Sequence, residues 1–307
     1  MPDVPARAAS WAEWLYFNGR ASGVRFYVTF FIGPAHGPGR RDAGVRLQLE
    51  RGGRLASYSE AAVIDEAALL EHAPDMTIGR SRVRLDGLRY ELRLDLPAEK
   101  GGARATGSVF LDAIPGRSVP PFTIRGAGGW LSGYVVPVLS GALGGELVVG
   151  GERMSLQGGE GYHDHNWGFW KGVSWRWGQV HHEDLSFVYG RVYPPADAAD
   201  PERIPGMLAV LGREGPLGYS TQLAIEETDD GASGRPQRIT VRGSGEALDV
   251  RMELTVEDAV STRMGQGFFG AGMDFLQLRA RYVVKGRIGE RDIDFEAAGA
   301  AETFRGR

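Results

Sequence analysis

An all-β fold of antiparallel strands, closed into two successive barrels, is what the sequence predicts. Apolar and polar residues alternate in short runs that recur about every 8 to 12 residues, a spacing typical of sandwiches and barrels. The 307 residues include 46 glycines, well above the usual share of about 7%, and glycines favour the tight turns that join such strands. Roughly eighteen strands are expected, which exceeds one small barrel.

The first half of the chain is predicted to contain one helix among strands. Residues 65–72 are good helix formers and end before Pro74, so a short helix is expected there. Asp86-Gly87 supplies a hairpin turn between two alternating runs. The expected strands of this half cover residues 11–18, 24–32, 45–49, 82–86, 90–94, 105–111, 130–139, 146–149 and 153–156.

The second half is predicted to contain strands throughout. Its clearest alternation runs over residues 248–256, where apolar side chains occupy every second position. The glycine-rich stretch 265–273 lacks the following helix and Lys that a phosphate-binding loop needs. Phe268 and Phe269 in this stretch are interpreted instead as part of an apolar lip over a cavity, with a bulged turn packed on the barrel as the alternative. The expected strands cover residues 175–181, 185–192, 207–211, 219–225, 239–241, 248–256 and 276–282, with a last strand near 295.

Composition excludes several classes of protein. The formal net charge is -4 without any block of Lys or Arg, so nucleic acid is not an expected partner. The chain has no cysteine, which excludes disulfides and a Cys nucleophile. No run of about 18 apolar residues is present, and the start lacks the apolar core of a signal peptide. We therefore expect a soluble, cytoplasmic protein.

Residues 161–168 form the most unusual stretch of the chain, because polar and aromatic side chains crowd together there. In an extended strand, alternate side chains share a face. One face would carry Tyr162, Asp164 and Asn166. The other would carry His163, His165 and Trp167.

This stretch resembles the Asp-His-Asn/Gln-Trp-Gly signature of the hydroxyneurosporene synthase family, the carotenoid hydratases and their lipocalin-like relatives, which include pericyclases. Four other segments resemble parts of the same family: the start at 13–19, the approach to the signature at 130–144, its aromatic continuation at 175–178 and the closing strand at 302–304. The resemblance implies two tandem lipocalin-like barrels. We place them at residues 1–170 and 171–307, with a cavity at their junction.

The chemistry of an alkene hydratase assigns roles to these side chains. A carboxylic acid in a dry pocket stays protonated near neutral pH because burial disfavours its charged form. Asp164 is the expected acid, with His165 to orient it or to position water and Tyr162 beside it as a third catalytic group. Aromatic faces stabilise a carbocation. The expected substrate-binding residues are Trp130, Tyr134, Asn166, Trp167, Trp175, Trp177, Phe268 and Phe269.

The predicted function is acid-assisted hydration or cyclisation of an apolar, isoprenoid-type alkene, without a cofactor or metal. Peripheral contact with a membrane is a further hypothesis, since such a substrate would be collected from lipid. Three alternatives stay open at this stage: a pericyclase that acts as a shape template, a non-catalytic binding protein for hydrophobic ligands, and a motif that only holds two barrels together. A metal site at His163, His165 and the pair His181-His182 is a weaker alternative, because Glu183 falls at no recognised ligand spacing.

Overall fold

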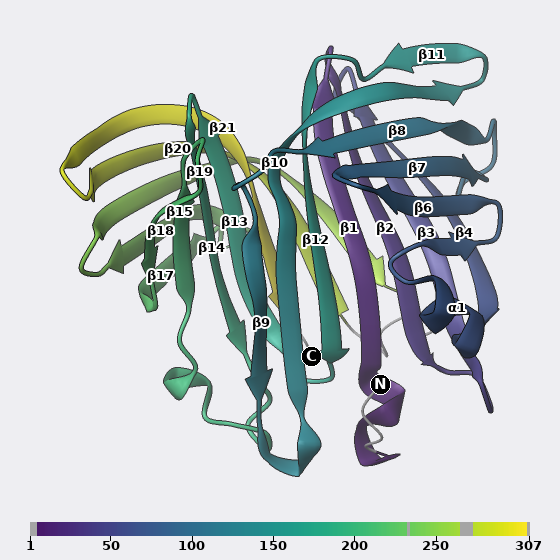
Figure 1. Cartoon of the computed structure of the whole chain (residues 1–307), viewed down its shortest axis with the longest axis horizontal. Coiled ribbons are helices and arrows are strands. Elements are labelled where there is room, and N and C mark those ends of the chain that lie inside the picture. Colours follow the sequence, from purple (N-terminus) through teal and green to yellow (C-terminus); the bar gives the residue numbers. More distant parts are fainter. Residues whose placement is uncertain (1–4, 232–233, 265–272, 306–307) are drawn as a thin grey trace. The chain divides into compact units, whose positions relative to one another are not determined.

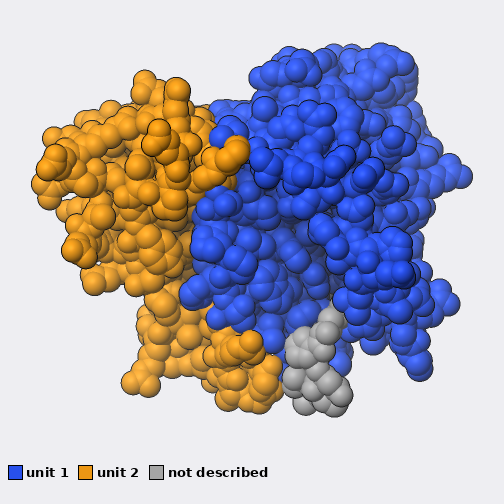
Figure 2. All heavy atoms as spheres, viewed as in Figure 1, with its two compact units in different colours: residues 1–114, 118–123, 131–169 blue, residues 115–117, 124–130, 170–307 orange. Residues whose placement is uncertain are grey.

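The computed structural model describes residues 5–231, 234–264 and 273–305. Strands make up 71% of the protein and helices 6%, in two nearly closed antiparallel β-barrels. This confirms the predicted all-β fold with tandem lipocalin-like barrels. By their contacts, residues form two compact units whose main boundary lies between Phe169 and Trp170, while residues 115–117 and 124–130 belong to the second unit (Figure 2).

The first unit is built on a sheet of twelve strands, in the order β4-β3-β2-β1-β12-β10-β8-β7-β6-β5, with β9 and β11 also paired to β10 (Figure 1). The strands are β1 (Trp11–Ala21), β2 (Val24–Ala35), β3 (Arg40–Arg51), β4 (Arg54–Asp65), β5 (Met76–Ile78), β6 (Ser81–Asp86), β7 (Arg89–Leu96), β8 (Ala105–Ala113), β9 (Val119–Arg125), β10 (Leu131–Val149), β11 (Glu152–Ser155) and β12 (Gly159–Phe169).

The second unit is built on a sheet of nine strands, in the order β16-β15-β14-β13-β21-β20-β19-β18-β17. The strands are β13 (Ser174–His182), β14 (Leu185–Tyr193), β15 (Met207–Leu211), β16 (Pro216–Ser220), β17 (Gln222–Asp229), β18 (Pro236–Ser244), β19 (Leu248–Met264), β20 (Met273–Ile288) and β21 (Arg291–Arg305).

Helical structure in the described residues is short. The predicted helix is confirmed as α1 (Glu66–His72), and the Asp65 side chain caps it by accepting a hydrogen bond from the Ala68 amide. Three short segments of 3-10 helix are also present: η1 (Pro5–Ser10), η2 (Ala127–Gly129) and η3 (Pro201–Arg203). None of these helices has the length and apolar character needed to span a bilayer.

Each unit has its own apolar core. In the first unit, Phe17, Val28, Leu47 and Leu92 are among the side chains that fill the barrel. In the second unit, the alternating residues of β19 bury Val250, Met252 and Leu254, as their spacing predicts. The side chains of each core mark the inner face of its sheet. Because side chains alternate along a strand, the face occupied by any other residue of that strand follows from its position.

Three strands have no counterpart in the sequence analysis: β4, β5 and β9. The side chains of β4 are mostly exposed or half-buried along its length, so the strand lacks the apolar alternation that reveals a buried face. β5 has only three residues. Two expected strands, 130–139 and 146–149, are parts of the single long strand β10.

Candidate functional site

β12 carries the motif and lies in the middle of the first sheet, between β1 and β10. Its two faces have different surroundings. His163 pairs in register with Phe17 of β1, which belongs to the barrel core. Asp164 pairs with Tyr16, so both side chains lie on the sheet face turned away from that core. The motif therefore presents its carboxylate on the outer face of the first barrel.

The Asp164 carboxylate is buried, at 5% exposure, and both its oxygens accept hydrogen bonds. The Tyr162 hydroxyl donates to Oδ2 over 2.8 Å, and the Asn166 side-chain amide donates to Oδ1 over 2.6 Å. These contacts join residues i, i+2 and i+4 of one strand, which places all three side chains on one face. We call Tyr162, Asp164 and Asn166 the carboxylate cluster.

Burial raises the pKa of Asp164 from its ordinary 3.8 to about 7, while the hydrogen bonds from Tyr162 and Asn166 act in the opposite direction. The carboxyl group is therefore able to gain and lose a proton near neutral pH. In its protonated form it needs an acceptor. A hydroxyl can accept and donate, whereas an amide nitrogen only donates, so the acidic proton belongs on Oδ2, facing Tyr162.

The strand ladder is interrupted beside Asp164. On β10, Val135 pairs with His165 and Val138 pairs with His163, so the two residues Val136 and Pro137 stand opposite the single residue Asp164. Proline has no N–H to give to a ladder, and in sheets it is confined to edges and bulges. Bulges are frequent beside active sites because they redirect side chains. This bulge opens the backbone pairing at the carboxylate cluster.

Aromatic side chains share the face of the carboxylate cluster. Tyr16 lies directly opposite Asp164, with its ring centroid 6.3 Å from that of Tyr162. Trp14 and Tyr134 lie on either side of Asn166, on β1 and β10. All are less than a tenth exposed. Tyr134 is a predicted substrate-binding residue, whereas Trp14 and Tyr16 are not, because the local sequence does not reveal that β1 pairs with β12.

His165 lies on the opposite face from Asp164 and makes a different contact. Its Nε2 atom is 2.8 Å from Glu13 Oε1 on β1, and its ring centroid is 5.2 Å from that of Trp167. The Trp167 ring covers Gly133, where any side chain would overlap it. The expected contact between His165 and Asp164 is not made, and Trp167 does not face the acid. Strand alternation is the reason for both corrections.

His163 is a core residue. It is 1% exposed, its ring stacks on Phe17 with centroids 4.0 Å apart, and Tyr90 approaches it edge-on at 4.4 Å. Nδ1 lies 2.9 Å from the carbonyl oxygen of Tyr16, so Nδ1 carries the proton, because a carbonyl only accepts. Burial lowers the pKa of His163 to about 3, which keeps the imidazole neutral.

The remaining predicted aromatic residues are not among the described residues of the first unit. Trp130, Trp175 and Trp177 belong to the second unit. There Trp175 stacks on Phe304 at 3.8 Å, and the Trp177 ring covers Gly190. Phe268 and Phe269 lie outside the described residues. Of the eight predicted substrate-binding residues, only Tyr134 and Asn166 are thus shown on the face of Asp164.

Among residues 5–231, 234–264 and 273–305, no group of three or more His, Asp or Glu side chains is placed to hold a metal ion. The histidines of the alternative metal site make other contacts. His181 Nδ1 is 2.9 Å from the Ser186 hydroxyl, and His182 stacks on Phe295 with centroids 4.4 Å apart. Their positions do not favour the metal interpretation.

Comparison with known proteins shows the fold. No family model matches the sequence, and no curated protein is significantly similar to it. Solved structures are similar over nearly the whole chain. A Nitrosomonas europaea protein assigned to AttH is 15% identical with a TM-score of 0.60, over 96% of this chain and 92% of that one.

Two further structures have the same architecture. CghA, which has also been crystallised with Sch210972, is 14% identical with a TM-score of 0.61, over 97% of this chain and 88% of that one. Kievitone hydratase from Nectria haematococca is 14% identical with a TM-score of 0.58, over 97% and 90%. The tandem lipocalin-like fold is therefore established, while the narrower family suggested by the sequence motif is not.

Proposed function

We propose that this protein is an enzyme of the hydratase or cyclase type that acts on an apolar alkene, with Asp164 as the acid. The single observation that carries the proposal is the buried Asp164 carboxyl, held between Tyr162 and Asn166 with its pKa raised to about 7. A structural neighbour that is named a hydratase supports the same class of chemistry, although a shared fold does not imply a shared reaction.

In the proposed hydration, the protonated Asp164 transfers its proton to one carbon of the double bond. A C–H bond forms, the π bond breaks, and the positive charge develops on the other carbon. A water oxygen then bonds to that carbon and releases a proton, which restores the acid. In the cyclising variant, a second double bond of the substrate takes the place of water and a proton is lost from carbon.

The aromatic residues around the carboxylate cluster suit the cationic step. Tyr16 and Tyr162 lie on the face of Asp164, and Trp14 and Tyr134 flank Asn166. The faces of such rings attract a cation, by about 2 kcal/mol or more in a dry site. Their apolar surface also suits a substrate of isoprenoid type. The proposed substrate class is therefore an alkene that can form a tertiary cation.

The test is a search for water addition with a matched pair of variants. The purified protein is incubated in H₂¹⁸O with linear isoprenoid alkenes, from monoterpenes to carotenoids, and products are sought by mass spectrometry as alkene plus labelled water or as isomers of unchanged mass. Asp164→Asn keeps the shape of the side chain and removes the acid. We expect product from the wild type and a loss of about 10²- to 10⁴-fold in turnover in the variant.

The control is Asp292→Asn, which makes the same change at an exposed position of β21 and should leave turnover unchanged. Near-ultraviolet circular dichroism of all three proteins checks the fold. If Asp164→Asn turns over the substrate as the wild type does, the acid role is wrong and a template-type pericyclase is favoured. If an alkene binds tightly but is always recovered chemically unchanged, the protein is a carrier. If Asp164→Asn unfolds, the motif is structural.

A further inference from the structure

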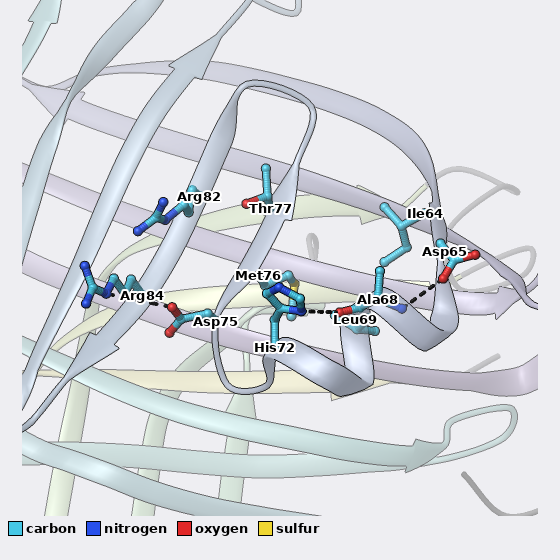
Figure 3. Close-up of a pocket in the computed structure, with 10 residues that line it drawn as sticks. All are labelled: Ile64, Asp65, Ala68, Leu69, His72, Asp75, Met76, Thr77, Arg82 and Arg84. Carbon is cyan, nitrogen blue, oxygen red and sulfur yellow. Dashed lines mark hydrogen bonds and ion pairs between the residues drawn. The ribbon is translucent and has the colours of Figure 1, made fainter.

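A pocket of about 520 Å³ opens in the first unit, far along the sheet order from β12 (Figure 3). β4 and β5 stand at the two ends of that order and are not ladder partners there. The pocket is lined by the end of β4, by α1, by β5 and by β6. It therefore lies where the first barrel is not closed by strand pairing.

The floor of this pocket is apolar. Met76 belongs to the core of the first barrel, and Ile64 and Leu69 pack against the same core. α1 has no fully buried residue, and Ile64 and Leu69 are only half-buried. Apolar core atoms are consequently accessible at the unpaired end of the sheet, which is unusual for a barrel whose interior is otherwise filled.

The rim of the pocket carries two arginines, Arg82 and Arg84, beside two aspartates. Within the described part of the chain, the Arg82 guanidinium makes no ion pair or hydrogen bond, and Figure 3 shows it beside Thr77, with no dashed contact. Arg84 has one long ion pair, 3.8 Å from its Nε to Asp75 Oδ2, between side chains that are 45% and 35% exposed. An exposed ion pair of this kind contributes little free energy, so Arg84 also remains able to bind an anion.

Two carboxylates also line the pocket, and each accepts a hydrogen bond from a backbone amide. Asp65 accepts from the Ala68 amide at 2.9 Å, and Asp75 accepts from the Leu85 amide at 2.9 Å. In addition, Arg82 lies directly opposite Arg93 on β7, and like charges in that position destabilise a sheet by about 0.2 to 1 kcal/mol. An anion bound to Arg82 would offset this repulsion.

We propose that this pocket binds an amphipathic carboxylate, with its apolar tail on Ile64, Leu69 and Met76 and its carboxylate on Arg82 and Arg84. A guanidinium matches the two oxygens of a carboxylate, and the volume falls in the range of about 300 to 1,000 Å³ of small-molecule sites. A single negative charge is favoured over a phosphate dianion, because Asp65 and Asp75 also line the pocket. The site is separate from the carboxylate cluster.

The test uses decanoate as the probe, titrated into the full chain by isothermal calorimetry. We expect saturable binding to the wild type, and binding at least tenfold weaker in Arg82→Gln, which removes no side-chain hydrogen bond or ion pair between described residues. The matched control is Arg54→Gln, the same change at the opposite end of β4 from Ile64, about 33 Å away along the strand. It should bind decanoate as the wild type does, and so should Asp164→Asn.

Two further measurements examine the two halves of the ligand. Decanol, which has the same tail without the charge, should bind at least tenfold more weakly than decanoate. Leu69→Glu, which puts a carboxylate on the apolar floor, should also abolish binding. The proposal is overturned if the wild type shows no saturable binding, if decanol binds as well as decanoate, or if Arg82→Gln binds like Arg54→Gln.

Discussion

The two faces of β12 bury ionisable side chains in different ways. On the inner face, His163 is packed between Phe17 and Tyr90, and its Nδ1 contacts a backbone carbonyl. On the outer face, Asp164 is held by two side chains that can themselves exchange or donate protons. Burial drives both residues toward their neutral forms, which lowers the pKa of the histidine and raises that of the carboxyl.

This difference separates a structural residue from a candidate for chemistry. With its pKa near 3, His163 does not change its charge at any pH near neutrality. Asp164, with its pKa near 7, does change charge there, and it has an acceptor and donor in Tyr162. His163 and Asp164 are adjacent in one strand, but they lie on opposite faces of the sheet. The different surroundings of the two faces give the two residues different roles.

The largest expected change in stability comes from a substitution on the inner face of β12. Phe17→Ala removes a ring that is 2% exposed and stacks on His163, and it leaves a cavity in the barrel core. We expect a loss of about 3 to 5 kcal/mol in the free energy of unfolding, measured by urea denaturation. A loss below about 1 kcal/mol would show that the inner face of β12 is not the packed core described here.

The next effect concerns the pH dependence of stability. The folded-state pKa of Asp164 is raised to about 7 from 3.8, so the folded state binds the proton more tightly than the unfolded state. Stability is then lost as pH rises from about 4 to about 7. Asp164→Asn lacks this loss, so from pH 5 to pH 8 its free energy of unfolding should improve relative to wild type by about 3 kcal/mol.

Urea denaturation of both proteins at the two pH values measures this difference. Both carry His163, so the contribution of that residue cancels. A difference between the proteins that is the same at pH 5 and pH 8 would contradict a raised pKa at Asp164. It would also remove the main support for an acid at this position.

A smaller effect is expected at the hydrogen bond from Tyr162. Its donation to Asp164 lowers the pKa of the carboxyl, so Tyr162→Phe should raise that pKa further, by about one unit or about 1.4 kcal/mol. The pH at which Asp164 ionises, followed by NMR of its side-chain carbon, should move upward. A downward movement would show that the hydroxyl does not donate to this carboxylate.

The smallest effect on stability is expected at the contact between Glu13 and His165 on the inner face. Glu13 and His165 side chains are 24% and 30% exposed, so solvent weakens their attraction. Glu13→Gln should change the free energy of unfolding by less than about 1 kcal/mol and leave turnover intact. A large loss of turnover would place His165 and Glu13 in the catalytic machinery, and would break the distinction between the two faces.

Much of the fold and part of the site could be predicted from local sequence. The period-two pattern of residues 248–256 specified a buried face, and the helix at 65–72 was marked by its composition and by Pro74. The same alternation placed Tyr162, Asp164 and Asn166 together. Such features depend on neighbours in the chain, and a strand or helix period is fixed by backbone geometry.

Sequence by itself therefore determined the all-β class, the face that carries the acid and the polar partners two residues away on either side of it. Only the tertiary structure decided which strands flank β12, and so brought Tyr16 opposite Asp164 and Glu13 to His165, pairs separated by more than a hundred residues. It also decided the burial that raises the pKa of Asp164. Strand pairing and desolvation arise from contacts between distant segments, which no local pattern encodes.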